Sequence, residues 1–342
     1  MAPATFSIMA ENRHKLKTGT SRQRVALGDK RLTCVEICTG AGGQALGLEQ
    51  AGFHHVALVE IEKQYCQIIG ENQPDWNLIC GDVTEFDGSP YAGVDLFAGG
   101  VPCPPFSAAG KQLGADDERD LFPAALRIIE QIQPRAVMLE NVRGFLDPKF
   151  DAYRQSILDR LEELGYVTHI KLLKSSDYGV SQLRPRTIIV GISKAEPGAF
   201  EFPQPSEEEP PTVGELLFDL MAANGWEGAE RWRDMADGIA PTLVGGSKKH
   251  GGPDLGPSRA RKAWAELGVD GAGVANEAPA PGFQGMPRLT PRMMARIQGF
   301  PDEWGFGKGK TVACRMIGNA FPPPVAKAVG LEIRRCLEDG QR

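Results

Sequence analysis

Four side chains have the types and the places in the sequence that nucleophilic catalysis requires. Cys103 lies between two prolines in the glycine-rich stretch FAGGVPCPPFSAAG, after a predicted strand. Glu140 ends a second predicted strand, and Arg184 and Arg186 precede a third. Prolines restrict the backbone beside the thiol, and nearby cations favour the thiolate, which is the nucleophilic form. We expect the four side chains to converge at one sheet edge, although each alone also fits a structural role as core thiol, helix cap or surface arginine.

A glycine-rich turn and two acids indicate a site for a nucleoside-bearing cofactor. Gly40, Gly42 and Ala45 fit the spacing GxGxxA between a predicted strand and a predicted helix, and Glu60 ends the next strand. Such a turn lets a ligand approach the backbone, and the acid can bind ribose hydroxyls. Asp82 ends a further strand, where it could accept a hydrogen bond from an adenine amino group. The pattern does not separate NAD from S-adenosylmethionine, and it is also consistent with glycines that serve packing alone and with Asp82 as a helix cap.

The elements that position these residues alternate between short apolar strands and amphipathic helices. This alternation predicts an α/β fold, a Rossmann-like doubly wound and mostly parallel sheet covered on both faces. The predicted strands are 31–38, 55–61, 77–82, 93–99, 135–142, 167–173 and 186–192, and the predicted helices before residue 193 are 43–52, 63–72, 123–134 and 151–166.

The regular pattern divides the 342-residue chain into segments. Residues 1–30 form a polar lead-in without the apolar core of a secretory signal. Residues 31–193 and 288–342 form the large domain, and the last helix follows Pro322. Residues 194–287, rich in proline, glycine and charge, predict a second, smaller and irregular domain. No run of about 18 apolar residues predicts a membrane span, so we expect a cytoplasmic protein.

The cysteines and histidines give no pattern of a metal site. The seven cysteines form no CxxC pair, and the five histidines do not cluster with them. We expect no metal and reduced thiols, most of them buried as small hydrophobic side chains.

The net charge of −6 argues mildly against a nucleic-acid partner, but one segment is basic. Residues 242–262 carry five lysines and arginines against one aspartate, a local charge of +4. A protein that neutralises phosphates needs a basic surface more than a basic total. The segment is equally consistent with a solvated, flexible loop.

The motifs, in their order along residues 32–335, resemble those of the DNA (cytosine-5) methyltransferase family. EICTGAGG resembles its first motif, Pro102-Cys103 its catalytic Pro-Cys motif, and Glu140-Asn141-Val142 its Glu-Asn-Val motif. Gln182, Arg184 and Arg186 match its Gln-x-Arg-x-Arg motif. RLTPRMMARIQGFP and GNAFPPPV resemble its last two motifs, and PTLVGG resembles the Thr-Leu element of its target-recognition domain, to which 194–287 corresponds.

The resemblance implies an activity and a set of site residues. Implied are methyl transfer from S-adenosylmethionine to C5 of a flipped cytosine in a short sequence of double-stranded DNA, a covalent bond between Cys103 and C6, no metal and a bacterial, nucleoid-associated monomer. A cognate restriction endonuclease is a further possible partner. The implied catalytic residues are Cys103, Glu140, Arg184 and Arg186. Those implied to bind the cofactor are Gly40, Ala41, Gly42, Gly43, Glu60, Ile61, Asp82, Val83, Gly100, Pro102, Asn319 and Ala320, and those implied to bind DNA are Ser107, Gln182, Thr242, Lys248, Lys249 and Arg259.

The sequence departs from the family pattern at several positions. Glu36 stands where the family usually has aspartate, and Cys38 where it has an aromatic ring that packs on the adenine. Pro104 replaces a common glutamine and Ala320 a common serine. None of these changes removes a residue that the chemistry requires.

Three other functions would use some of the same residues. An NAD-dependent oxidoreductase would use the glycine turn and Glu60 but leaves Cys103, Glu140 and the arginines unexplained. A non-catalytic DNA-binding relative would have lost the thiol or the carboxyl, and both are present. Methylation of tRNA, which some family members perform, keeps the same chemistry on another substrate.

Overall fold

The computed structural model describes residues 31–102, 120–245 and 253–339. Cys103, Ser107, Lys248 and Lys249 lie outside the described residues. Residues 31–342 form one compact unit. No described helix is both long and apolar enough to span a membrane. Within the described ranges, no group of three or more His, Cys, Asp or Glu side chains could hold a metal ion.

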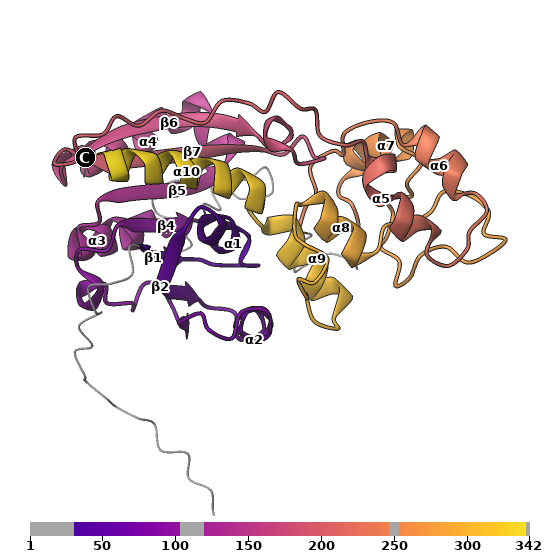
Figure 1. Cartoon of the computed structure of the whole chain (residues 1–342), viewed down its shortest axis with the longest axis horizontal. Coiled ribbons are helices and arrows are strands. Elements are labelled where there is room, and N and C mark those ends of the chain that lie inside the picture. Colours follow the sequence, from indigo (N-terminus) through magenta and orange to yellow (C-terminus); the bar gives the residue numbers. More distant parts are fainter. Residues whose placement is uncertain (1–30, 103–119, 246–252, 340–342) are drawn as a thin grey trace, which may run out of the picture. The chain divides into compact units, whose positions relative to one another are not determined.

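A sheet of seven strands forms the centre of this unit (Figure 1), in the order β3-β2-β1-β4-β5-β7-β6. Neighbouring strands from β3 to β5 are parallel, whereas β7 is antiparallel to both β5 and β6. The mostly parallel α/β sheet predicted from the sequence is therefore confirmed. The strands are β1 (Leu32–Ile37), β2 (Phe53–Glu60), β3 (Leu78–Cys80), β4 (Leu96–Gly100), β5 (Ala136–Val142), β6 (Tyr166–Lys174) and β7 (Pro185–Ser193).

Helices cover both faces of the sheet (Figure 1). On one face, α3 (Phe122–Ile132) and α4 (Asp151–Glu163) bury their apolar side chains against alternate strand residues. On the other face lie α1 (Gly43–Gln50) and α10 (Pro323–Asp339). The last helix, expected after Pro322, buries one apolar face formed by Val325, Val329, Ile333 and Cys336. Short 3₁₀ turns are η1 (Ser89–Tyr91), η4 (Arg143–Leu146), η5 (Pro148–Phe150) and η6 (Ser175–Tyr178).

The segment expected to be irregular contains three helices. A capping box between Thr212 and Glu215, which satisfies backbone groups at the helix start, begins the first of them. A separate apolar core joins these helices to the two that follow and to Ala41, Leu46 and Ile68. Because this core crosses residue 288, the division into two domains stays a prediction. The helices are α5 (Val213–Ala222), α6 (Ala229–Met235), α7 (Ser258–Glu266), α8 (Pro291–Ile297) and α9 (Lys310–Asn319), and α2 (Lys63–Asn72) follows β2.

The cysteines differ in part from the expectation of reduced thiols. Cys66 on α2 and Cys80 at the end of β3 form a disulfide, with Cα atoms 6.0 Å apart. The two lie 14 residues apart without a CxxC spacing, so only the path from β2 through α2 to β3 brings them together. Of the free thiols, Cys34, Cys314 and Cys336 are buried, as expected.

Candidate functional site

The carboxyl of Glu140 and the guanidinium of Arg186 form an ion pair at the ends of neighbouring strands. Glu140 Oε1 lies 2.7 Å from Arg186 Nε, and the two side chains are 12% and 11% exposed. β5 and β7 run antiparallel, so the end of β5 meets the start of β7 and the sheet register brings the two residues together. The structure therefore places these two predicted catalytic residues in contact.

Burial controls the protonation of Glu140. Burial raises its pKa above the ordinary value, while the positive charges of Arg186 and then Arg184 oppose the increase. A carboxyl balanced in this way can hold a proton and share it with a ligand, as general acid catalysis requires.

Gly100 lies beside this carboxyl, on the strand that leads to the predicted nucleophile. β4 is parallel to β5 with Gly100 opposite Glu140, and a Cβ on Gly100 would lie 3.4 Å from Glu140 Oε2. Two residues farther along the chain is Pro102, which is exposed. Cys103 itself lies outside the described residues. The absence of a side chain at residue 100 leaves room beside the carboxyl for a ligand.

Gln182 and Arg184 lie in the interior and not at a surface. Both side chains are fully buried. Gln182 donates from Nε2 to Gln298 Oε1 at 2.6 Å and accepts at Oε1 from the backbone N–H of Leu243 at 2.8 Å. Arg184 donates from Nη1 to the carbonyl oxygen of Leu243 and from Nη2 to that of Gly318, each at 2.8 Å. These hydrogen bonds give both side chains a structural role, while Arg184 Nε has no hydrogen-bond partner among the described residues. The DNA contact expected of Gln182 and the catalytic role expected of Arg184 stay predictions.

The glycine turn has one open side and one packed side. Gly40 has a φ of +60°, and a Cβ there would meet nothing nearer than the Cys38 carbonyl oxygen at 3.8 Å. A Cβ on Gly42 would lie 2.9 Å from Trp304 Cζ2, and one on Gly43 would lie 2.3 Å from the Phe321 carbonyl oxygen. Only Gly40 is therefore open to a ligand, whereas Gly42 and Gly43 are required by the protein's own packing. The close approach of Gly43 to the Phe321 carbonyl also brings Ala320, the residue before Phe321, near the turn.

Glu60 holds the turn through its carboxylate. Oε2 accepts from the backbone N–H of Gly40 at 2.7 Å, and Oε1 accepts from that of Glu62 at 2.9 Å. Burial raises the pKa of Glu60, and these two hydrogen bonds oppose the increase. A carboxylate has about four acceptor positions, and the backbone N–H of Ile61 also bonds this one, so some acceptor capacity remains for a ligand hydroxyl. Ile61, the next residue, is 61% exposed.

The remaining predicted cofactor residues differ in exposure. Asp82 is partly exposed, and its Oδ1 accepts from the backbone N–H of Thr84 at 2.8 Å, a turn-capping contact. Val83 is buried. Cys38 has a φ of 55°, the left-handed region that a non-glycine residue rarely adopts. Asn319 is exposed at the end of α9, beside Gly245.

Two of the predicted DNA-binding residues at the surface are described. Thr242 is partly exposed and directly precedes the Leu243 that Gln182 and Arg184 hold. Arg259 is exposed on the first turn of α7, and among the described residues no ion-pair partner accompanies it. Val244 contacts the chain at Gly256, just before this helix, so the basic helix begins next to the Thr242 loop.

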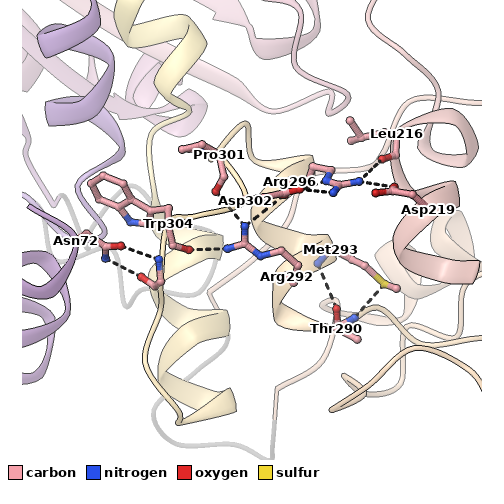
Figure 2. A network of polar contacts seen from close by, with 11 residues as sticks. Asn72, Leu216, Asp219, Thr290, Arg292, Met293, Arg296, Pro301, Asp302 and Trp304 are labelled. Atoms are coloured by element: carbon pink, nitrogen blue, oxygen red, sulfur yellow. Dashed lines mark hydrogen bonds and ion pairs between the residues drawn. The ribbon is translucent and has the colours of Figure 1, made fainter. Parts of the chain in front are cut away.

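A network of arginines on α8 was not predicted from the sequence (Figure 2). Arg292 donates to the carbonyl oxygens of Pro301 at 3.0 Å and of Trp304 at 2.5 Å. Arg296 bonds Asp302 and also Asp219 on α5. The available signal was the spacing of the two arginines, four residues apart on one helix face. Their partners are distant in sequence and could not be read from it.

Comparison with known proteins agrees with the family resemblance seen in the motifs. The family model described as C-5 cytosine-specific DNA methylase matches residues 32–335. The Type II methyltransferase M.NgoMIV of Neisseria gonorrhoeae is 56% identical over 311 residues, covering 90% of this chain and 99% of that protein. The Type II methyltransferase M.NaeI of Lentzea aerocolonigenes is 56% identical over 312 residues, covering 90% and 75%.

Solved structures share the fold at low sequence identity. The Entamoeba histolytica methyltransferase EhMeth has a TM-score of 0.62 at 14% identity, covering 92% of this chain and 100% of that one. A Spodoptera frugiperda DNMT2 mutant has a TM-score of 0.61 at 17% identity, covering 90% and 99%. The resemblance seen in the motifs is confirmed: the chain belongs to the C-5 cytosine-specific DNA methylase family and is a DNA (cytosine-5) methyltransferase.

Proposed function

We propose that the protein methylates C5 of a cytosine flipped out of a specific short sequence in double-stranded DNA. S-adenosylmethionine is the donor, and Cys103 forms a transient covalent bond with C6. The observation that carries this proposal is the buried Glu140–Arg186 pair beside Gly100, because the chain runs from Gly100 through Pro102 directly to Cys103.

The open side of the glycine turn fits the donor. Gly40 presents unfilled space, the carboxylate of Glu60 has acceptor positions left, and the exposed side chain of Ile61 offers an apolar surface. These features suit a ribose and an adenine ring. When bound, S-adenosylmethionine supplies an electrophilic methyl group. Asp82, Val83, Asn319 and Ala320 are proposed as further contacts.

The chain's own residues would activate the base. The Cys103 thiolate adds to C6, and the electrons of the C5–C6 double bond move into the ring toward N3. Glu140 holds a proton at N3 and offsets this charge, while Arg186 binds the base carbonyl oxygen. C5, now nucleophilic, takes the methyl group. Loss of the C5 proton to a base then restores the double bond and expels the thiolate of Cys103.

Access to C6 requires the cytosine to leave the duplex. Flipping costs a few kcal/mol of stacking, which contacts to the DNA must offset. We propose that Thr242, Arg259 and the basic residues of 242–262, including Lys248 and Lys249, contact the DNA, together with Ser107. Residues 194–287 are proposed as the target-recognition domain. Since the curated relatives are Type II methyltransferases, a restriction endonuclease for the same site is a proposed partner in the bacterial cytoplasm.

The test is methylation of a mixed-sequence DNA by the purified protein with S-adenosylmethionine, read by base-resolution sequencing of 5-methylcytosine. We expect methyl groups at one short motif. Methylation of tRNA without DNA would keep the chemistry and overturn the substrate. Measurable donor binding without methylation of either nucleic acid would overturn the activity.

A further inference from the structure

The segment 300–306 packs against one side of the glycine turn. The indole of Trp304 is only 3% exposed, and its Cζ2 lies 2.9 Å from the Cβ position of Gly42. Trp76 lies 3.5 Å from the same position. Phe300, whose ring centroid is 5.8 Å from that of Trp304, comes within 3.0 Å of the Cβ position of Gly43. The turn thus has aromatic rings on one side and open space at Gly40 on the other.

Hydrogen bonds from two helices fix this segment in place (Figure 2). Asn72 at the end of α2 accepts from the backbone N–H of Gly305 at 2.7 Å and donates to the Gly305 carbonyl oxygen at 2.8 Å. Arg292 on α8 binds the Trp304 carbonyl oxygen at 2.5 Å. The backbone that directly follows the indole, from the Trp304 carbonyl to the Gly305 carbonyl, is therefore held by both α2 and α8, and the ring has little freedom to move away from Gly42.

The backbone at Gly42 has little room to move against the indole. Gly42 adopts a φ of +78°, and it is the cap residue from which α1 starts. If the indole moved away, the turn would lose its packing against Trp304. The backbone of Gly40, whose N–H donates to Glu60, would then be free to shift. Affinity depends on how far a site is ordered before its ligand arrives, because disorder in the free protein must be lost on binding.

We propose that Trp304 is a positioning residue for the methyl donor: it fixes the glycine turn in the shape that binds S-adenosylmethionine, without touching the donor. The inference rests on the proposed use of that donor. It predicts a selective effect, in which affinity for the donor falls while binding of DNA and the chemical step change little.

The main experiment compares Trp304→Phe with Trp264→Phe. Both indoles are buried in the same apolar core, and neither Nε1 has a hydrogen-bond partner within the described part of the chain. Trp264 lies on α7, away from the glycine turn, so its variant controls for loss of core packing. Calorimetry with S-adenosylmethionine and steady-state kinetics give Kd, both KM values and kcat. We expect Trp304→Phe to raise Kd and KM for the donor about tenfold, with kcat and KM for DNA within about twofold. Trp264→Phe leaves the donor Kd unchanged.

A second variant pair tests the contact itself. Gly42→Ala places a methyl group against the indole, whereas Phe at position 304 lacks the Cζ2 and Cη2 atoms that it would meet. The loss of donor affinity caused by Gly42→Ala is therefore smaller in the Trp304→Phe background than in the wild type, a non-additivity typical of residues in contact. The conservative Trp304→Phe variant keeps an apolar ring, whereas Gly42→Ala is strained by the positive φ at residue 42, so circular dichroism checks the fold of each variant before its donor affinity is compared.

The outcomes distinguish failure of the positioning role of Trp304 from failure of the proposed function. Donor binding by the wild type with equal donor affinity in Trp304→Phe overturns the positioning role and leaves the proposed function intact. An equal loss in Trp264→Phe also overturns it, because the effect would then reflect core packing. Absence of donor binding in the folded wild type overturns the proposed donor, and the inference with it.

Discussion

Asn141 donates from its side-chain Nδ2 to the carbonyl oxygen of Val101 at 3.1 Å, inside the protein. Its own Oδ1 accepts from the backbone N–H of Val142 at 2.8 Å. The side chain therefore joins the end of β5, next to Glu140, to the last buried residue before Pro102 and Cys103. The Asn of the Glu-Asn-Val motif thus ties the end of β5 to the backbone two residues before Cys103.

Asn141→Ala is expected to lower kcat about tenfold or more, because a small displacement of a nucleophile is costly. Donor affinity stays unchanged, since the glycine turn is not involved. Asn77→Ala is the control for loss of an amide: this exposed side chain also donates to a backbone carbonyl, that of Val56 at 2.7 Å, but beside β2 and β3 and not β5. Single-turnover methylation measures the effect, and an equal fall in both variants would contradict the role of Asn141.

Cys103→Ala is expected to abolish turnover while the fold and donor binding are retained, because the thiolate is the proposed nucleophile. Methylation assays, circular dichroism and calorimetry check the three properties. Substantial residual methylation in the folded variant would refute the covalent mechanism.

Glu140→Gln is expected to slow methylation strongly and to change how stability depends on pH. Burial raises the pKa of Glu140 in the folded protein, so the unfolded chain releases the proton first as the pH rises. The resulting stability is fully present below the unfolded pKa and is lost as the pH rises through the folded value. As the pH falls from neutral to about 4, the free energy of unfolding of the wild type should thus increase relative to that of the variant. Urea unfolding at several pH values measures this difference, and a constant difference would contradict the raised pKa.

Arg184→Met is expected to destabilise the fold by about 3 kcal/mol, because two buried carbonyl oxygens lose charged donors. Arg335→Met serves as control. Its ion pair with Glu332 lies on the surface, where such pairs contribute about 0–1 kcal/mol. Denaturant titration compares the two. A loss of kcat without a loss of stability in Arg184→Met would instead support direct contact with the base.

The sequence predicted the sheet well because its signals are local. Each strand is a short apolar run and each covering helix has one apolar face, as with Val325, Val329, Ile333 and Cys336 on α10. α9 was missed although half of its residues are apolar, because Gly309 precedes it and Gly318 lies in its last turn. The helices of 194–287 were hidden among prolines and glycines, although Thr212 and Glu215 form a recognisable capping box.

The sequence singled out Glu140 and Arg186, and strand register brings the two side chains into contact, while their catalytic roles stay predictions. It could not reveal that Arg184 is buried and bound to Leu243 and Gly318, since those partners lie 59 and 134 residues away. The Cys66–Cys80 pairing and the packing of Trp304 on Gly42 depend in the same way on tertiary structure alone.

If residues 194–287 are the target-recognition domain proposed above, the apolar core shared by α5 to α9 restricts how this enzyme could be given a new target sequence. Exchanging residues 194–287 for those of a relative would separate α5 from α8, whose Arg296 bonds Asp219 and the Leu216 carbonyl oxygen. The inserted segment would then pack against α8 and α9 of this chain and not against those of its own protein. A chimera that also exchanges α8 and α9 keeps that core intact, but it carries a foreign Trp304 loop to the native glycine turn. Transfer of specificity between such enzymes therefore requires two junctions to be matched, one in the core and one at the turn.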